Sequence, residues 1–110
     1  MLTAHQRLRS RADFTRIVRS GRRSKGALVI VSALPGRGEH SRAGFTVGKS
    51  VGNAVVRHRV TRQLRAIMAE LLPALPVPTD VVLRALPPAA TATFWALRAD
   101  VQRSVEALPR

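Results

Sequence analysis

Hydrophobic residues in the middle of the chain recur at the spacing of one helix face. From Asn53 to about Leu72, successive apolar positions are four, four, three and four residues apart. That spacing places them on one side of an α-helix, and the stripe consists of Val56, Val60, Leu64, Ile67 and Leu71. We therefore expect a long helix here that buries this stripe and exposes its opposite face to solvent.

Shorter patterns before this segment predict one helix and two strands. Ser10 is a suitable N-cap for a helix that runs to Ser20 and stops at Gly21. The β-branched stretch 27–34 and the later stretch 42–49 are each typical of strands. Because the turn-rich sequence PGRGEHS lies between them, we expect these two strands to form a hairpin with a long loop.

The remaining segments complete a single domain. The sequence PALPVPTD ends the long helix, VVLRAL predicts a third strand, and the last segment predicts a helix capped near Thr91 or Thr93. Residues 1–9 are basic and show no periodicity, so we expect them to form a flexible arm ahead of a domain at residues 10–108. Two aromatic residues are expected in the core, namely Phe45 and Trp95.

The chain has 110 residues, a length that allows one modest core. Charge is distributed unevenly along it. The 19 Lys and Arg residues and six Asp and Glu residues give a formal net charge of +13. Residues 1–65 hold fifteen basic and two acidic residues, a net +13, whereas residues 66–110 hold four of each kind. So large an excess in one part of the chain indicates a polyanionic partner.

Several classes of protein are disfavoured by what the sequence lacks. The absence of cysteine excludes a disulfide scaffold, a Cys-ligated zinc site and a thiol nucleophile. The six carboxylates and three histidines are scattered, so we expect neither catalytic residues nor a metal site on the protein. No apolar run approaches the roughly 20 residues of a membrane span. We therefore expect a cytoplasmic protein with no membrane partner.

The exposed face of the predicted long helix is the strongest candidate for a nucleic-acid site. Four arginines fall within nine residues, and no acidic residue before Glu70 is available to pair with them along the helix. Upstream, Lys49 and its neighbouring glycines, Gly48 and Gly52, favour a phosphate near the start of the helix. Opposite the apolar stripe lie His58, Arg62 and Arg65, with Arg57 and Arg59 on its flanks.

Charge and composition alone leave other kinds of binding protein open. A ribosomal or RNA-chaperone protein would be equally small, basic and mixed in secondary structure. A helix-turn-helix DNA-binding protein would place a helix before the basic helix, where a strand is predicted here. A membrane-active cationic protein would expose an apolar face, whereas the apolar stripe here is expected to be buried.

The basic helix is also where the sequence resembles a known family. The run KSVGNAVVRHRVTRQLRAI is similar to the signature of the bacterial ribonuclease P protein component, typically KKVGNAVxRNRxKRxxR. Three further runs, RSRADFTRIVRSGRR, GFTVGK and TDVVLRALPPAA, resemble the family's opening helix, third strand and last strand. The chain departs from the family pattern at His58, usually Asn, and at Ser50 and Thr61, usually Lys.

The resemblance implies a compact α/β fold, an α+β sandwich in which a four-stranded mixed sheet packs with helices. It adds a short strand around residues 22–25, which gives the order α-β-β-β-α-β-α. It also implies that the helix beginning near Asn53 joins two parallel strands by a left-handed crossover. General rules of chain topology alone would favour a right-handed one.

The resemblance further implies an accessory subunit of ribonuclease P, the ribonucleoprotein that removes the 5′ leader from precursor tRNA. Catalysis would then reside in the RNA subunit with its Mg²⁺, and protein side chains alone would hold no cofactor. The implied partners are the catalytic RNA and the 5′ leader, with no obligate protein partner. Implied RNA contacts are Lys49, Ser50, Asn53, Arg57, His58, Arg59, Arg62 and Arg65, and the implied leader cleft involves Phe14, Arg57 and Arg11.

Overall fold

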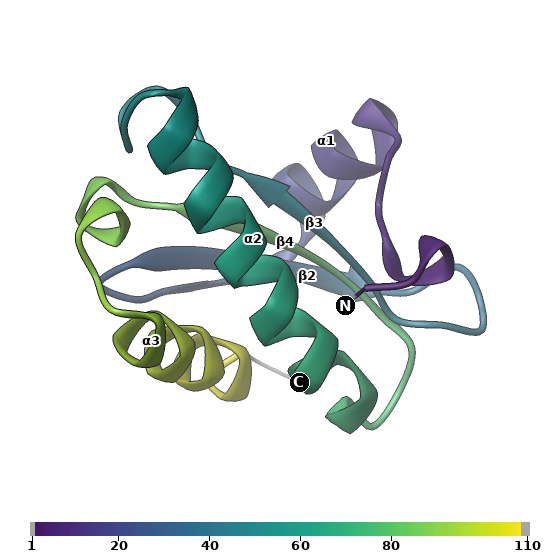
Figure 1. Ribbon diagram of the computed structural model, residues 1–110. Coiled ribbons are helices and arrows are strands. Elements are labelled where there is room, and N and C mark those ends of the chain that lie inside the picture. Colours follow the sequence, from purple (N-terminus) through teal and green to yellow (C-terminus); the bar gives the residue numbers. More distant parts are fainter. Residues whose placement is uncertain (1, 109–110) are drawn as a thin grey trace.

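Figure 1 shows the computed structural model, which describes residues 2–108. A four-stranded sheet forms the centre of the molecule, with helices on both faces. In chain order the elements are η1 (Ala4–Gln6), α1 (Arg11–Ser20), β1 (Arg22–Lys25), β2 (Val29–Pro35), β3 (Arg42–Thr46), α2 (Ala54–Leu71), η2 (Leu72–Ala74), β4 (Thr79–Ala85), η3 (Pro87–Ala90) and α3 (Phe94–Glu106).

The strands lie in the order β1-β2-β4-β3. β2 is antiparallel to both β1 and β4, whereas β3 runs parallel to β4. The predicted hairpin between the stretches 27–34 and 42–49 is therefore wrong, because β4 lies between β2 and β3. β4 is buried on both of its faces from Asp80 to Leu83, and a strand of that kind belongs in the interior of a sheet.

The connection from β3 through α2 to β4 is left-handed, which is unusual. In Figure 1, α2 lies in front of the sheet, β3 points toward the start of α2, and β4 lies to the left of that direction. Two parallel strands joined in this way form a left-handed crossover, which is rare because strand twist favours the right-handed path. The fold class, including the short strand β1, agrees with what the family resemblance implies.

The main core lies between the sheet and the layer formed by α2 and α3 (Figure 1). Alternate residues of β2 and β4 point into it, and the apolar stripe of α2 faces them as predicted. Val60, Leu64 and Ile67 are buried there, with Val56 and Leu71 packed at its edge. A smaller cluster on the other face lies beneath α1 and consists of Leu8, Ile17 and Val82.

Side chains at the starts of the three α-helices act as caps. Each accepts a hydrogen bond from the backbone N–H three residues later: Ser10 at 3.4 Å, Asn53 at 3.0 Å and Thr93 at 3.0 Å. Of the two candidates for the last helix, Thr93 is therefore the cap and Thr91 is not. Such a bond satisfies one of the free N–H groups at a helix start.

A buried carboxylate ties α3 to the turn between β1 and β2. Asp100 accepts hydrogen bonds from the backbone N–H groups of Ala27, Leu28 and Val29 at 3.1, 2.9 and 3.1 Å. The same carboxylate explains the glycine in this turn, because a Cβ on Gly26 would lie 2.4 Å from Asp100 Oδ2. The position of α3 on the sheet is thus fixed by backbone donors as well as by apolar packing.

Two predictions of exposure are wrong. Residues 1–9 are expected to form a flexible arm, and Met1 lies outside the described residues. The part that is described packs on the sheet: Leu2 and Leu8 are buried, and the N–H of Leu8 donates to Ala43 O at 3.0 Å. This segment covers the free edge of β3, which would otherwise expose unpaired backbone groups. Trp95, expected in the core, is 72% exposed, whereas Phe45 packs against the core as expected.

Candidate nucleic-acid interface

The outer face of α2 carries cations that the protein itself does not neutralise. Arg62 and Arg65 are exposed, and within residues 2–108 neither side chain forms a hydrogen bond or an ion pair. His58 lies on the same exposed face and is also without such a partner among these residues. The one acid of α2, Glu70, pairs instead with Arg98 of α3. The cationic face therefore lies opposite the buried stripe, as the spacing predicts, and is available to phosphates.

Arg57 and Arg59, on the flanks of α2, are held differently from each other. Arg59 donates a hydrogen bond from its guanidinium to the carbonyl oxygen of Ala90, which ties it to η3. Arg57 is half-buried, and its Nε is enclosed with no hydrogen-bond partner among the described residues. An enclosed N–H without an acceptor costs free energy, so a bound phosphate or carbonyl oxygen at Arg57 would be stabilising.

The residues just before α2 divide between two tasks. The side-chain oxygen of Asn53 serves as the helix cap, so its NH₂ group remains the donor with which it could contact RNA. Lys49 is exposed and forms no ion pair within the described chain. Ser50 is also exposed, but it lines a cleft on the opposite face of the sheet rather than the outer face of α2.

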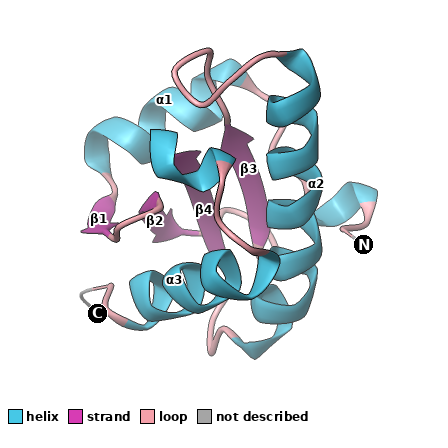
Figure 2. Cartoon of the chain, turned by 60° about the vertical axis from the view of Figure 1, so that its left-hand side comes forward, coloured by secondary structure: helices cyan, strands magenta, loops and turns pink. Residues whose placement is uncertain are grey.

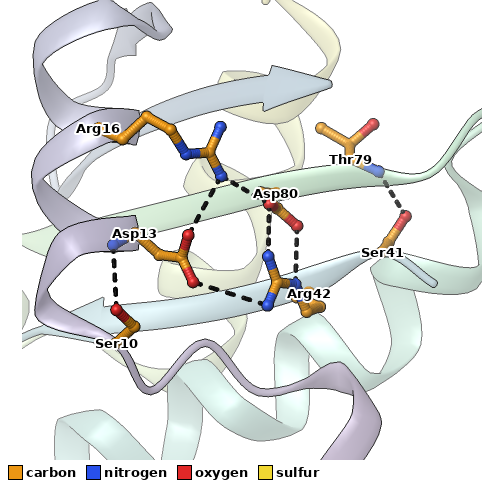
Figure 3. Close-up of polar contacts among 7 residues, drawn as sticks. All are labelled: Ser10, Asp13, Arg16, Ser41, Arg42, Thr79 and Asp80. Atoms are coloured by element: carbon orange, nitrogen blue, oxygen red, sulfur yellow. Dashed lines mark hydrogen bonds and ion pairs between the residues drawn. The ribbon is translucent and has the colours of Figure 1, made fainter. Parts of the chain in front are cut away.

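The face of the sheet beneath α1 contains an ion-pair network (Figure 3). Asp80 of β4 is fully buried and accepts hydrogen bonds from Arg42 of β3, at 3.0 and 2.8 Å, and from Arg16 of α1, at 3.0 Å. Asp13 of α1 pairs with both arginines, at 3.5 and 3.7 Å. These four charges cancel one another, so two of the basic residues of the N-terminal half are not available to RNA.

The network also fixes where α1 lies. The pKa of the Arg42 guanidinium is raised, chiefly by the hydrogen bond that Arg42 donates to Asp80. Burial lowers this pKa, whereas the negative charges of Asp80 and Asp13 raise it. Arg42 is therefore a permanent cation that joins β3, β4 and α1. Anchored at this end of the sheet, α1 leaves the other end of the same face uncovered.

That uncovered end forms a cleft of about 270 Å³. Its walls combine apolar side chains, hydroxyl groups and two arginines, one from β1 and one from β4. Val18 of α1, which is 43% exposed, forms one wall. The lining residues that carry the argument are Val18, Arg23, Ile30, Thr46, Ser50 and Arg84. Such a mixture suits a single-stranded nucleic acid, because cations meet its phosphates and apolar groups meet its bases.

The residues that the family resemblance assigns to the leader cleft do not line the cleft beside α1. Phe14 packs with the small cluster under α1, and a Cβ on Gly44 would lie 2.3 Å from its ring, so the ring sits directly over the backbone of β3. Arg11 is exposed at the start of α1, and Arg57 belongs to α2 on the other side of the sheet. Their contact with a leader stays a prediction, and the structure does not bring the three together in this cleft.

Sequence reasoning missed the two arginines that do line the cleft. Arg84 carried a usable signal, because it is the one charged residue in the apolar strand VVLRAL and must therefore lie on a face that meets solvent. Arg23 lies directly opposite Ser32 in the ladder between β1 and β2, which places it on the same face. Its strand is polar throughout and gave no signal of its own.

The described part of the chain offers neither a metal site nor a membrane-spanning helix. Between residues 2 and 108, no three His, Cys, Asp or Glu side chains gather in a way that could hold a metal ion. No helix in that range is both long and apolar enough to cross a membrane. The basic outer face of α2 and the cleft beside α1 are thus the two surfaces whose chemistry suits RNA.

Comparison with known sequences finds one family. The model of the Ribonuclease P family matches residues 2–108. The ribonuclease P protein component of Kocuria rhizophila is 46% identical over 105 residues, covering 96% of this chain and 93% of that protein. The component of Beutenbergia cavernae is 46% identical over 109 residues, covering 98% and 92% of the two chains.

Comparison with solved structures finds the same fold. The RNase P protein from Thermotoga maritima superposes with a TM-score of 0.83 at 23% identity, covering 94% of this chain and 98% of that one. The RNase P protein of Staphylococcus aureus gives 0.82 at 24% identity, covering 92% and 93%. At such low identity these two matches establish the fold, while the matched sequences above carry the evolutionary relationship.

Proposed function

Because this chain belongs to the ribonuclease P protein family, and so is the accessory subunit of a tRNA-processing endoribonuclease, we propose how its two basic surfaces divide the work. The outer face of α2 binds the catalytic RNA. The cleft between α1 and the open end of the sheet holds the single-stranded 5′ leader of precursor tRNA. One observation carries this division: Arg62 and Arg65 on α2, and Arg23 and Arg84 in the cleft, have no carboxylate partner among the described residues and form two separate surfaces. Other arginines of the same chain are paired with carboxylates.

The chemistry of α2 supports binding to folded RNA. Arg62 and Arg65 project from a rigid helix whose other side is fixed in the core, so the backbone that carries them loses no further freedom when they bind phosphate. Guanidinium groups bond phosphate in a two-pronged geometry. The half-buried Arg57 adds a donor that lacks an acceptor in the protein. These properties favour a partner with closely spaced phosphates, as a structured RNA has.

The chemistry of the cleft supports binding to an unpaired strand. Arg23 and Arg84 lie on one face of the sheet, on the two strands that flank β2. Ile30 of β2, directly opposite Arg84, and Val18 of α1 line the same cleft. The cations meet the phosphates of a strand in a way that is independent of its sequence. The apolar groups offer contact to bases that a duplex would hide. This arrangement suits a leader whose sequence differs from one precursor tRNA to the next.

Two further parts of the proposal concern the RNA partner. Hydrolysis of a phosphodiester by ribonuclease P needs divalent metal, and we assign Mg²⁺ to the RNA subunit rather than to protein side chains. The protein lowers the concentration of Mg²⁺ that is needed, because its arginines neutralise phosphates that would otherwise repel one another.

Precursor tRNA is made and processed in the bacterial cytoplasm, which we propose as the site of action.

The experiment is cleavage of a precursor tRNA by a bacterial ribonuclease P RNA at low Mg²⁺, with the protein or its variants added. The wild-type chain is expected to restore cleavage at the mature 5′ end, and the variant Arg62→Ala/Arg65→Ala is expected to lose this effect. The control Arg37→Ala/Arg103→Ala removes the same charge elsewhere, because neither residue belongs to α2 or lines the cleft. It should behave like wild type.

A second arm of the experiment tests the cleft. Arg84→Ala should weaken binding of the assembled enzyme to precursor tRNA about tenfold, which is the effect of losing one close charge-assisted contact. Binding of mature tRNA, which lacks the leader, should not change. If Arg84→Ala weakens binding of both tRNAs equally, the cleft does not bind the leader. If Arg62→Ala/Arg65→Ala leaves cleavage unchanged, α2 is not part of the RNA interface.

A further inference from the structure

The single tryptophan of the chain is displayed on the surface. Trp95 in the first turn of α3 is 72% exposed. Its ring meets the ring of Phe94 edge to face, with centroids 5.2 Å apart and planes at 88°. Phe94 in turn packs against the main core. The indole is therefore held in place by a neighbour that is itself anchored, while most of its own surface faces water.

Two contacts place the start of α3, which carries Trp95, beside α2. Arg59 of α2 bonds the carbonyl of Ala90, just before α3, and Glu70 of α2 pairs with Arg98, one turn after Trp95. The start of α3 is thus tied to α2 between residues 59 and 70. The exposed residues of α2 in that interval are Arg62, Arg65 and Ala66. Figure 2 shows α3 beginning beside the middle of α2.

We propose that Trp95 stacks on an unpaired base of the catalytic RNA while Arg62 and Arg65 bind the neighbouring phosphates. This rests on the proposed role of α2 and extends that surface onto α3. An aromatic ring beside cations is the arrangement by which proteins bind single-stranded nucleotides, because every base has a face on which to stack. Stacking also adds affinity that salt does not screen.

The charge of the surroundings favours RNA over a protein partner. A second copy of this chain would bring a net charge of +13 against a chain of the same charge, and the repulsion would oppose association at this strongly basic face. The nearest acid, Glu70, is already paired with Arg98. A polyanion that also carries flat apolar groups satisfies both features of the surface, and RNA has that composition.

The test uses the fluorescence of Trp95, which reports on this site alone because the chain has one tryptophan. Titration of the protein with the ribonuclease P RNA is expected to quench the emission until the site is saturated. Trp95→Ala is expected to weaken binding about 5- to 150-fold without changing the dependence of affinity on salt. Trp95→Phe should keep part of the lost affinity, since a smaller ring still stacks.

A matched control is available in Val77, an apolar residue that is 60% exposed on the approach to β4. Val77→Ala should bind RNA like the wild type, and thermal melting should show all three variants folded. If the RNA binds without any change in emission, or if Trp95→Ala binds as tightly as wild type, the stacking proposal is overturned.

The outcomes also separate this proposal from the one it rests on. Loss of affinity in Arg62→Ala/Arg65→Ala with no effect at Trp95 would leave α2 as the RNA interface and reject stacking alone. No effect of the arginine variant would reject the α2 interface itself. Emission that changes with protein concentration in the absence of RNA would show that Trp95 contacts a second copy of the chain, which also overturns the proposal.

Discussion

Helices α2 and α3 cover the same face of the sheet, but their arginines are in opposite situations. On α3, Arg98 pairs with Glu70 and Arg103 pairs with Asp100. On α2, Arg62 and Arg65 meet no carboxylate within residues 2–108. The helices thus differ in how their arginines are paired as well as in number, four on α2 and two on α3. What marks α2 as an interface is the absence of nearby acids, because a guanidinium whose N–H groups and charge already meet a carboxylate binds a phosphate less strongly.

The same comparison explains what each acid does. Glu70 belongs to α2 in sequence, yet it neutralises a cation of α3. Asp100 belongs to α3 and points inward, where it serves backbone N–H groups of the β1–β2 turn. α3 thus uses its charges to hold the fold together, while α2 keeps its arginines for an external partner. Three substitutions test this contrast, in order of expected effect.

The largest effect should come from removing the inward-facing acid of α3. Asp100→Ala leaves three backbone N–H groups, one buried and two partly buried, without their acceptor, and we expect it to lower the free energy of unfolding by about 3 kcal/mol. Urea denaturation measures the change. Glu106→Ala, an exposed acid at the end of α3, is the control and should change stability by less than about 0.5 kcal/mol. Equal stability of the two variants would contradict a structural role for Asp100.

An intermediate effect, on binding and not on stability, should come from the cations of α2. For Arg62→Ala/Arg65→Ala, the slope of log affinity for RNA against log salt should flatten by roughly 1.4 to 1.8, which corresponds to two lost phosphate contacts. The midpoint of unfolding should stay the same, because neither side chain has a partner among the described residues. Filter binding at several salt concentrations gives the slope, and an unchanged slope would show that neither arginine meets a phosphate.

The smallest effect should come from making α3 resemble α2. Glu70→Ala releases Arg98 from an ion pair whose acid is 58% exposed, so the loss of stability should be below about 1 kcal/mol. Because Arg98 lies one turn from Trp95, its freed charge should strengthen RNA binding and steepen the salt dependence by less than about 0.9. Glu70→Gln should give the same shift. Weaker RNA binding in both variants would contradict the idea that the ion pair with Glu70 prevents Arg98 from binding RNA.

The candidate site could be anticipated only in part. The run of arginines on α2 has a local signature, and its position opposite the buried stripe follows from helix geometry alone. The cleft has no such signature, because its walls come from four strands and α1, whose approach depends on the network around Asp80. Ser50 illustrates the difference: it stands within the motif of α2 in sequence, yet it faces the cleft.

What the sequence determined by itself is local: the long helix and its buried stripe, the cap at Ser10, and the concentration of charge in the first 65 residues. These follow from spacing and from side chains acting on their own neighbours. Only the tertiary structure decided that β4 separates β2 from β3, that Leu2 and Leu8 are buried, and that Trp95 is exposed. Each of those outcomes depends on which surfaces meet across long separations in the chain, and periodicity along one segment carries no information about its partner.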